Sequence, residues 1–194
     1  MTMKISVTAV PLVVSCWGSL GAREMNKKIA QFMKCECEEN TPFHHIHATG
    51  SFGWRWMPEY VKELGVDLAA HPRIDMREYI YDMPQVLAAA DLIVCRAGAA
   101  TIAEVCASGT PCIMVPSPNV TGNHQEKNAR VLERSGAAAV VREADCDGKS
   151  LYETAKAILS DAGRMRAMRA SARDMAVVDA AERIYQTALD LAKH

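Results

Sequence analysis

Three short segments place glycine or polar residues after an apolar run and before a helical pattern. In the first, Gly18, Ser19 and Gly21 follow the apolar run 10–16. Glycine lets the backbone approach a ligand closely, and the free N–H groups at a helix start favour an anion such as phosphate. Ser19 would add a hydroxyl donor. The segment matches neither G-x-G-x-x-G nor a Walker P-loop, and a plain strand-to-helix turn is the alternative.

The second segment consists of small residues, which leave room for a ligand over the start of the next helix. Its members are Gly98, Ala99, Ala100 and Thr101. Glu104 lies three residues after Thr101. Its carboxylate could accept both hydroxyls of a ribose, as acidic residues do in nucleotide sites, or it could form a capping box with Thr101. Two such loops at one sheet edge would present two helix starts to a diphosphate.

The third segment is rich in groups that both donate and accept hydrogen bonds, as sugar hydroxyls require. These residues are Asn119, Asn123, His124 and Gln125. The alternative is a polar surface loop with Asn123 as a helix cap. A further stretch, 77–83, precedes a helical pattern, and the backbone of Ile80 could meet the edge of a base. An ordinary strand-to-helix connection explains that stretch equally well.

The hydrophobic pattern predicts an α/β fold that would position these segments. Strands are expected at 10–16, 43–49, 74–79, 92–95, 111–115 and 137–141. Helices are expected at 22–34, 58–64, 83–90, 101–108, 125–135 and 151–194, the last broken near Gly163 and around 177–179. Such alternation predicts a doubly wound parallel sheet with helices on both faces, which binds ligands at the carboxyl ends of its strands. We expect one domain, 1–194, with a final helix at about 180–194.

Composition limits the classes of partner. The chain has 194 residues, 49% of them hydrophobic, and a net charge of −1, which gives no reason to expect a nucleic acid. No apolar run approaches the ~18 residues of a membrane-spanning helix. The apolar stretch 1–14 resembles a signal peptide only superficially, because Pro11 interrupts it and a glycine-rich turn follows. A buried strand is the better interpretation.

Seven cysteines, an odd number, favour free buried thiols in a reducing cytoplasm. Cys35 and Cys37 beside His44, His45 and His47 could bind a metal, but their spacing matches no standard zinc site. The sequence therefore predicts no metal site.

Together these segments resemble the C-terminal half of the MurG family of bacterial N-acetylglucosaminyltransferases. The matching stretches are 18–27 (GSLGAREMNK), 44–50 (HHIHATG), 77–105 (REYIYDMPQVLAAADLIVCRAGAATIAEV), 109–118 (GTPCIMVPSP) and 123–138 (NHQEKNARVLERSGAA). They follow the family's order and spacing over roughly residues 10–190. The resemblance implies a GT-B architecture, in which two Rossmann-like domains face each other across a cleft. This chain would be the Rossmann-like donor-binding domain, and the N-terminal acceptor domain would be absent.

The resemblance also implies the reaction, an inverting transfer of GlcNAc from UDP-GlcNAc to lipid I that makes lipid II for peptidoglycan. The family acts at the cytoplasmic face of the inner membrane, without a cofactor or a metal bound by the protein. The implied donor-binding residues are Gly18, Ser19, Gly21, Gly98, Ala99, Ala100 and Thr101 for the diphosphate, Ile80 for uracil, Glu104 for ribose, and His124 and Gln125 for GlcNAc. The catalytic base and lipid I contacts would belong to the missing domain, so no catalytic residue and no turnover are expected here.

Two departures from the family pattern keep alternatives open. Trp17 stands where the family's first loop normally has a second glycine, which could weaken phosphate contact, and the acceptor half would be missing. One alternative is a separate catalytic subunit, as in the two-chain GlcNAc transferase of dolichol-linked oligosaccharide synthesis. Another is a non-catalytic domain that binds a nucleotide sugar. The apolar stripe Ile184, Ala188 and Leu191 in the final helix predicts self-association.

Overall fold

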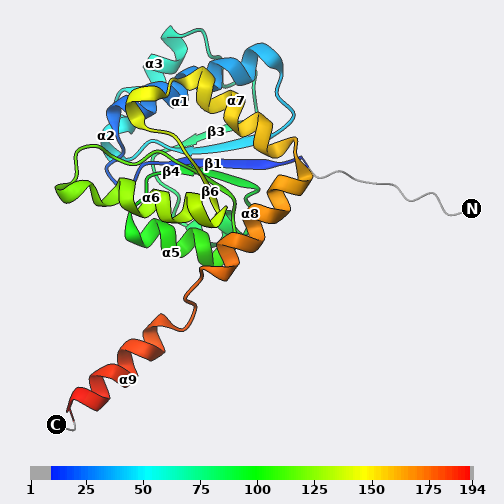
Figure 1. Ribbon diagram of the computed structural model, residues 1–194. Helices are drawn as coiled ribbons and strands as arrows, with labels where there is room; N and C mark the ends of the chain where they lie inside the picture. The colour runs from blue at the N-terminus through cyan, green and yellow to red at the C-terminus, as the bar shows by residue number, and fades with distance from the viewer. Residues whose placement is uncertain (1–9, 193–194) are drawn as a thin grey trace, which may run out of the picture.

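A computed structural model describes residues 10–192 and contains a six-stranded sheet (Figure 1). The strand order is β3-β2-β1-β4-β5-β6, and all neighbouring strands are parallel. The chain moves outward from β1 to β3 and returns to β4 on the other side of β1, so the direction of winding switches between β1 and β4. The strands are β1 (Leu12–Cys16), β2 (His44–Ala48), β3 (Ile74–Arg77), β4 (Leu92–Cys95), β5 (Cys112–Met114) and β6 (Ala138–Val140).

Helices cover both faces of the sheet, and each face buries its own hydrophobic core (Figure 1). One face carries α1, α3 and α7, and the other carries α4, α5, α6 and α8. The doubly wound α/β fold predicted from the sequence is therefore confirmed. The α-helices are α1 (Arg23–Glu39), α2 (Ser51–Trp54), α3 (Met57–Glu63), α4 (Met83–Ala89), α5 (Ala99–Ser108), α6 (His124–Ser135), α7 (Gly148–Leu159), α8 (Ala162–Asp174) and α9 (Ala180–Ala192), with 3-10 turns η1 (Thr121–Asn123) and η2 (Glu143–Asp145).

Some predicted boundaries are wrong for reasons that lie outside the local sequence. The helix expected to end at 34 continues to Glu39, and Glu36 near its end is buried with its carboxylate 2.9 Å from His45 Nδ1. The break expected near Gly163 falls just before it, where Asp161 accepts a hydrogen bond from the Arg164 N–H and starts α8. α2 was not predicted. The first strand begins at Leu12, and the expectation for residues 1–9 lies outside the described residues.

The cysteines serve as packing groups. All seven are free; four are buried and three are half-buried. Burial raises the pKa of every one of these thiols, so they stay protonated near neutral pH. Between residues 10 and 192, no three His, Cys, Asp or Glu side chains are grouped to hold a metal ion. Across the same residues, none of the helices is long and apolar enough to span a membrane.

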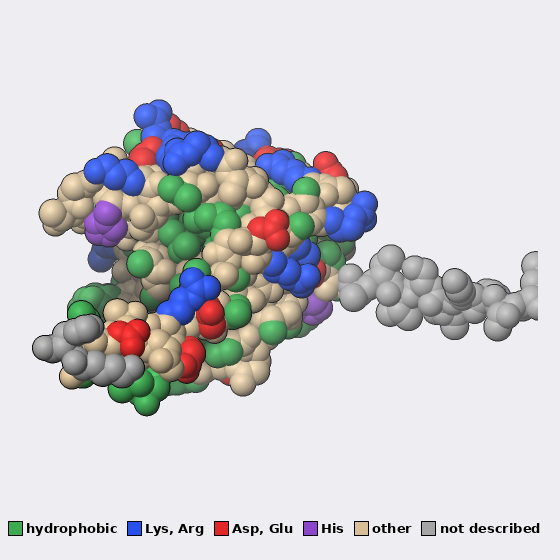
Figure 2. All heavy atoms as spheres, turned by 60° about the horizontal axis from the view of Figure 1, so that its bottom comes forward, with side chains coloured by type: hydrophobic (Ala, Val, Ile, Leu, Met, Phe, Trp, Pro, Cys, Tyr) green, Lys and Arg blue, Asp and Glu red, His purple; other side chains and the backbone are tan. Residues whose placement is uncertain are grey.

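The last helix, α9, stands away from the rest of the protein (Figure 1). It has no buried residue, and the helical pattern breaks at 175–179, which agrees with the predicted break around 177–179. Ile184 and Leu191 are 70% and 73% exposed. Figure 2 shows hydrophobic side chains at the surface beside the grey C-terminal residues. The helix thus presents an uncovered apolar stripe.

Candidate functional site

A cavity of about 180 Å³ lies at the carboxyl ends of the central strands, where the winding direction switches. This is the position at which doubly wound sheets bind ligands. Its lining residues are Cys16, Gly18, Ser19, Ala48, Tyr79, Ile80, Met83, Leu87, Ile93, Arg96, Thr101 and Glu104. Five predicted donor-binding residues meet there, namely Gly18, Ser19, Ile80, Thr101 and Glu104. They come from three separate segments that the sheet brings to one edge.

The first loop combines an open glycine with a packed one. Gly18 has a φ of +83°, and a Cβ built on it would meet no atom within 4 Å, so a ligand can approach its backbone. Gly21 closes the turn through a hydrogen bond from its N–H to the Gly18 carbonyl. A Cβ on Gly21 would lie 2.0 Å from the Thr49 carbonyl oxygen. Gly18 therefore has open space beside its backbone, and its predicted contact with a ligand stays a prediction, whereas packing against Thr49 already requires a glycine at position 21.

The second loop opens α5 toward the cavity. Gly98 is the N-cap of α5, and no side chain caps the helix start. The first N–H groups of the helix, from Ala99 onward, are therefore available to an anion. Glu104 lies inside α5 and lines the cavity. The capping-box alternative for Glu104 is wrong, because the helix starts two residues before Thr101.

The third loop lies beside the cavity but does not line it. The Gln125 Oε1 atom accepts a hydrogen bond from the Ser117 N–H at 2.9 Å. The His124 ring donates to the Thr121 carbonyl at 3.0 Å. Asn123 occupies the N-cap position of α6, but its side chain does not cap the helix. In this structure the side chains of His124 and Gln125 form hydrogen bonds with the backbone of the third loop itself. Their predicted contacts with a sugar stay predictions.

Three polar residues near the site were not singled out from the sequence. Tyr79 and Arg96 line the cavity. Asn128 joins α6 to the second loop through a hydrogen bond from its Nδ2 to the Ala97 carbonyl. Asn128 follows His124 by four residues on α6, a spacing that places both on one helix face. That spacing was the signal that could have identified Asn128.

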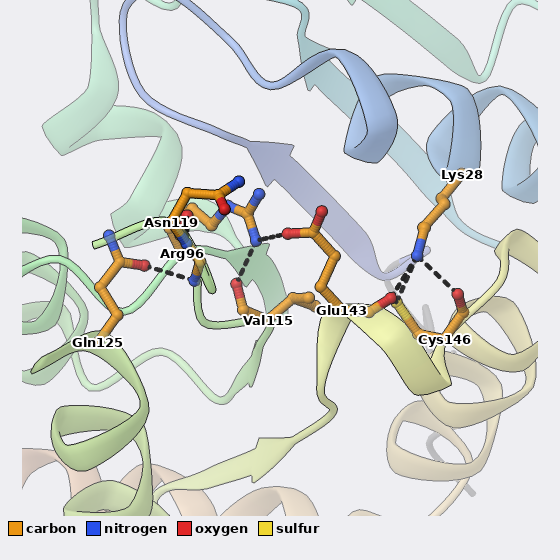
Figure 3. A network of polar contacts seen from close by, with 8 residues as sticks. Lys28, Arg96, Val115, Asn119, Gln125, Glu143 and Cys146 are labelled. Atoms are coloured by element: carbon orange, nitrogen blue, oxygen red, sulfur yellow. Dashed lines mark hydrogen bonds and ion pairs between the residues drawn. The ribbon is translucent and has the colours of Figure 1, made fainter. Parts of the chain in front are cut away.

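Arg96 lies at the centre of a polar network between the strand ends (Figure 3). Its Nη1 atom pairs with the Glu143 carboxylate at 2.6 Å and donates to the Val115 carbonyl at 3.0 Å. The guanidinium carbon lies 5.7 Å from the centre of the Trp17 ring. Trp17 is 5% exposed, packs into the core with α1 and does not line the cavity. The residue that departs from the family pattern thus supports Arg96 and leaves the cavity open.

Cys16 forms part of the cavity wall at the end of β1. Burial and, second, the negative charge of Glu104 raise the pKa of this thiol to about 12. A thiol with such a pKa is almost entirely protonated at neutral pH, and only the thiolate is a strong nucleophile. Cys16 therefore contributes a neutral thiol to the cavity wall.

A family model described as the glycosyltransferase family 28 C-terminal domain matches residues 12–184. The chain belongs to this family. A relative from Acetivibrio thermocellus is 40% identical over 185 residues, which are 95% of this chain and 48% of that protein. Another, from Caldanaerobacter subterraneus subsp. tengcongensis, is 42% identical over 176 residues, or 91% and 47% of the two chains. Both are UDP-N-acetylglucosamine–N-acetylmuramyl-(pentapeptide) pyrophosphoryl-undecaprenol N-acetylglucosamine transferases. The chain spans about half the length of these relatives.

Solved structures support the same placement. The crystal structure of Acinetobacter baumannii MurG is similar with a TM-score of 0.77 and 26% identity, covering 96% of this chain and 54% of that one. A structure of MnaA with UDP from S. aureus has a TM-score of 0.62 at 16% identity, covering 90% and 44% of the two chains, and shows the fold alone. The resemblance to the C-terminal half of the MurG family is confirmed.

Proposed function

We propose that this chain binds UDP-GlcNAc and forms the donor half of an inverting transferase that converts lipid I to lipid II. One observation carries the proposal. A single cavity at the switch point of the sheet joins an open glycine turn, an uncapped helix start and a carboxylate. These are the parts that a nucleoside diphosphate needs. The relatives that share about 40% of the sequence act on the same donor.

In this arrangement each part of the donor meets a different element. The uracil edge would meet the backbone at Ile80, and Glu104 would accept hydrogen bonds from the ribose hydroxyls. The diphosphate would lie between Ser19 and the start of α5. The sugar would extend toward the third loop, where Gln125 could release its bond to the Ser117 N–H and turn to a sugar hydroxyl.

The chemistry assigned to this half is stabilisation of the leaving group. As the acceptor hydroxyl attacks the anomeric carbon, negative charge develops on the departing UDP. The fixed N–H groups at the start of α5 would stabilise that charge, so we propose that no metal or cofactor is needed for donor binding. The base that deprotonates the acceptor is assigned to the half of the relatives that this chain does not span. We therefore expect donor binding without turnover, and action at the cytoplasmic face of the membrane.

Replacing Glu104 with alanine is expected to weaken UDP-GlcNAc binding by roughly 10- to 100-fold, because two hydrogen bonds to a carboxylate are lost. Calorimetric titration with UDP-GlcNAc, UDP, UDP-glucose and NAD would measure this, with and without EDTA. Glu63→Ala, on the exposed surface of α3, is the matched control. Equal affinity in wild type and Glu104→Ala would remove Glu104 from the site. Absence of binding to every uridine nucleotide would refute the proposed function.

We further propose that α9 mediates association between copies of the chain. Its stripe of Ile184, Ala188 and Leu191 is exposed, and nothing between residues 10 and 192 covers it. The average mass from light scattering should rise with concentration in the wild type. Ile184→Asp with Leu191→Asp should hold the mass at that of one chain, whereas Gln186→Asp, on the opposite helix side, should not. A wild type that stays monomeric at every concentration would contradict this proposal.

A further inference from the structure

We propose that Arg96 is the cation that binds the donor diphosphate, and that Glu143 is the positioning residue that holds its guanidinium beside the cavity. This inference rests on the proposed function, because it names a phosphate ligand within the same site. The observation behind it is an ion pair with unused hydrogen-bond donors between the two loops that surround the cavity.

Arg96 lies between the two phosphate-facing loops. It lines the cavity and precedes the N-cap of α5, Gly98, by two residues. Its guanidinium packs against Trp17, the residue immediately before Gly18. A diphosphate bridging Ser19 and the start of α5 would thus bring its negative charge close to the guanidinium.

The contacts of Arg96 engage one end of the side chain. Both the Val115 carbonyl and the Glu143 carboxylate bind Nη1, and Figure 3 shows these two contacts side by side. Among residues 10–192, no group accepts a hydrogen bond from Nε or Nη2 of Arg96. An arginine carries five N–H donors in a planar fork that fits two phosphate oxygens. The unoccupied part of this fork is what a diphosphate would use.

Glu143 is itself held in place by α1. Lys28 donates from Nζ to the peptide carbonyls of Glu143 and Cys146, which fixes the segment that follows β6 (Figure 3). The side chains of Arg96 and Glu143 are 14% and 18% exposed. A largely buried guanidinium without a counter-charge would be costly. Glu143 thus neutralises Arg96 when no ligand is bound and restrains its orientation at Nη1.

If the ion pair of Arg96 and Glu143 only stabilised the fold, its loss would not distinguish ligands that carry phosphate from ligands that lack it. A series of uridine ligands therefore tests the inference. Arg96→Gln is expected to weaken UDP and UDP-GlcNAc binding roughly 10- to 100-fold while changing uridine affinity by less than about twofold. Arg96→Lys should show an intermediate loss, since it keeps the charge and loses the fork. Glu143→Gln should weaken UDP binding less than Arg96→Gln does. Arg142→Gln, whose side chain is exposed and pairs with Asp145, should have no effect.

The measurement is the ratio of UDP to uridine affinity for each variant, by calorimetry, alongside a thermal melt. An unchanged ratio in Arg96→Gln would overturn the inference, as would equal losses for Arg96→Gln and Glu143→Gln. If Arg96→Gln does not fold, the ratio in Arg96→Lys decides in the same way. A wild type that binds uridine and UDP, with an unchanged ratio in the variants, refutes this inference alone. A wild type that binds no uridine nucleotide refutes the proposed function with it.

Discussion

Replacing Gly50 with alanine is expected to destabilise the protein by at least about 3 kcal/mol and to abolish donor binding. A Cβ at this position would lie 2.1 Å from the Gly21 nitrogen and 2.4 Å from the Leu20 carbonyl carbon. Both atoms belong to the backbone of the first loop, so no side-chain rotation relieves the clash. Gly50 also has a φ of +73°, which alanine adopts only with strain. The first loop would have to move away from the segment after β2.

Gly65→Ala separates the two causes of this loss. Gly65 has a φ of +81°, but a Cβ there would meet no atom within 4 Å. The Gly65→Ala variant should therefore lose only roughly 1–2 kcal/mol of stability, which is the cost of holding alanine at a positive φ, and it should keep donor binding. Urea unfolding of both variants measures their free energies of unfolding. Titration with UDP tests whether the first loop still supports donor binding. Equal stability losses in the two variants would show that the contact between the loops contributes nothing.

The sequence predicted the sheet and part of the cavity because those features depend on local patterns. Apolar runs marked the strands, and glycines after them marked the first two loops at the carboxyl edge. A parallel sheet then brings those loops together whatever the rest of the chain does. Ser19, Thr101 and Glu104 meet in one cavity for that reason.

The parts that could not be predicted depend on contacts between distant residues. The ion pair of Arg96 and Glu143 links positions far apart in the sequence, and Trp17 was judged only by its bulk. Its ring turns into the core because Arg96 and α1 provide a surface for it. The first helix was predicted to end at 34, whereas Glu36 is buried within α1 against His45 of β2. Periodicity carries no signal for such pairings.

That histidine belongs to a buried chain of hydrogen bonds around Ser15. The Ser15 Oγ atom lies 2.7 Å from both His45 Nε2 and His47 Nδ1, and His45 Nδ1 lies 2.9 Å from the Glu36 carboxylate. His47 Nδ1 also faces the Ser15 carbonyl, which can only accept, so Nδ1 carries the proton. Ser15 then donates to His45, and His45 donates to Glu36. Within this chain of hydrogen bonds, the His47 Nε2 atom is left over: it is buried and has no hydrogen-bond partner among residues 10–192.

Protonation of His47 would place a charge on that unpartnered nitrogen. Burial and, second, repulsion from His45 lower the pKa of the His47 imidazole from 6.5 to about 3. A folded pKa below the unfolded one stabilises the protein above pH 6.5, and this contribution is lost as the pH falls toward 3. The loss from this residue should reach about 2 kcal/mol between pH 7 and pH 5 and about 4 kcal/mol by pH 3.

Urea unfolding at a series of pH values between 7 and 5 would measure this loss above the range in which most carboxylates titrate. His47→Asn keeps a donor toward Ser15 and removes the titrating ring, so its free energy of unfolding should decline about 2 kcal/mol less than that of the wild type over this range. His44→Asn, at the exposed start of the same strand, should follow the wild type. If His47→Asn and the wild type lose stability in parallel, the acid sensitivity lies elsewhere. A steeper loss in the wild type and in His44→Asn than in His47→Asn would establish that the hydrogen bonds around Ser15 require a neutral His47.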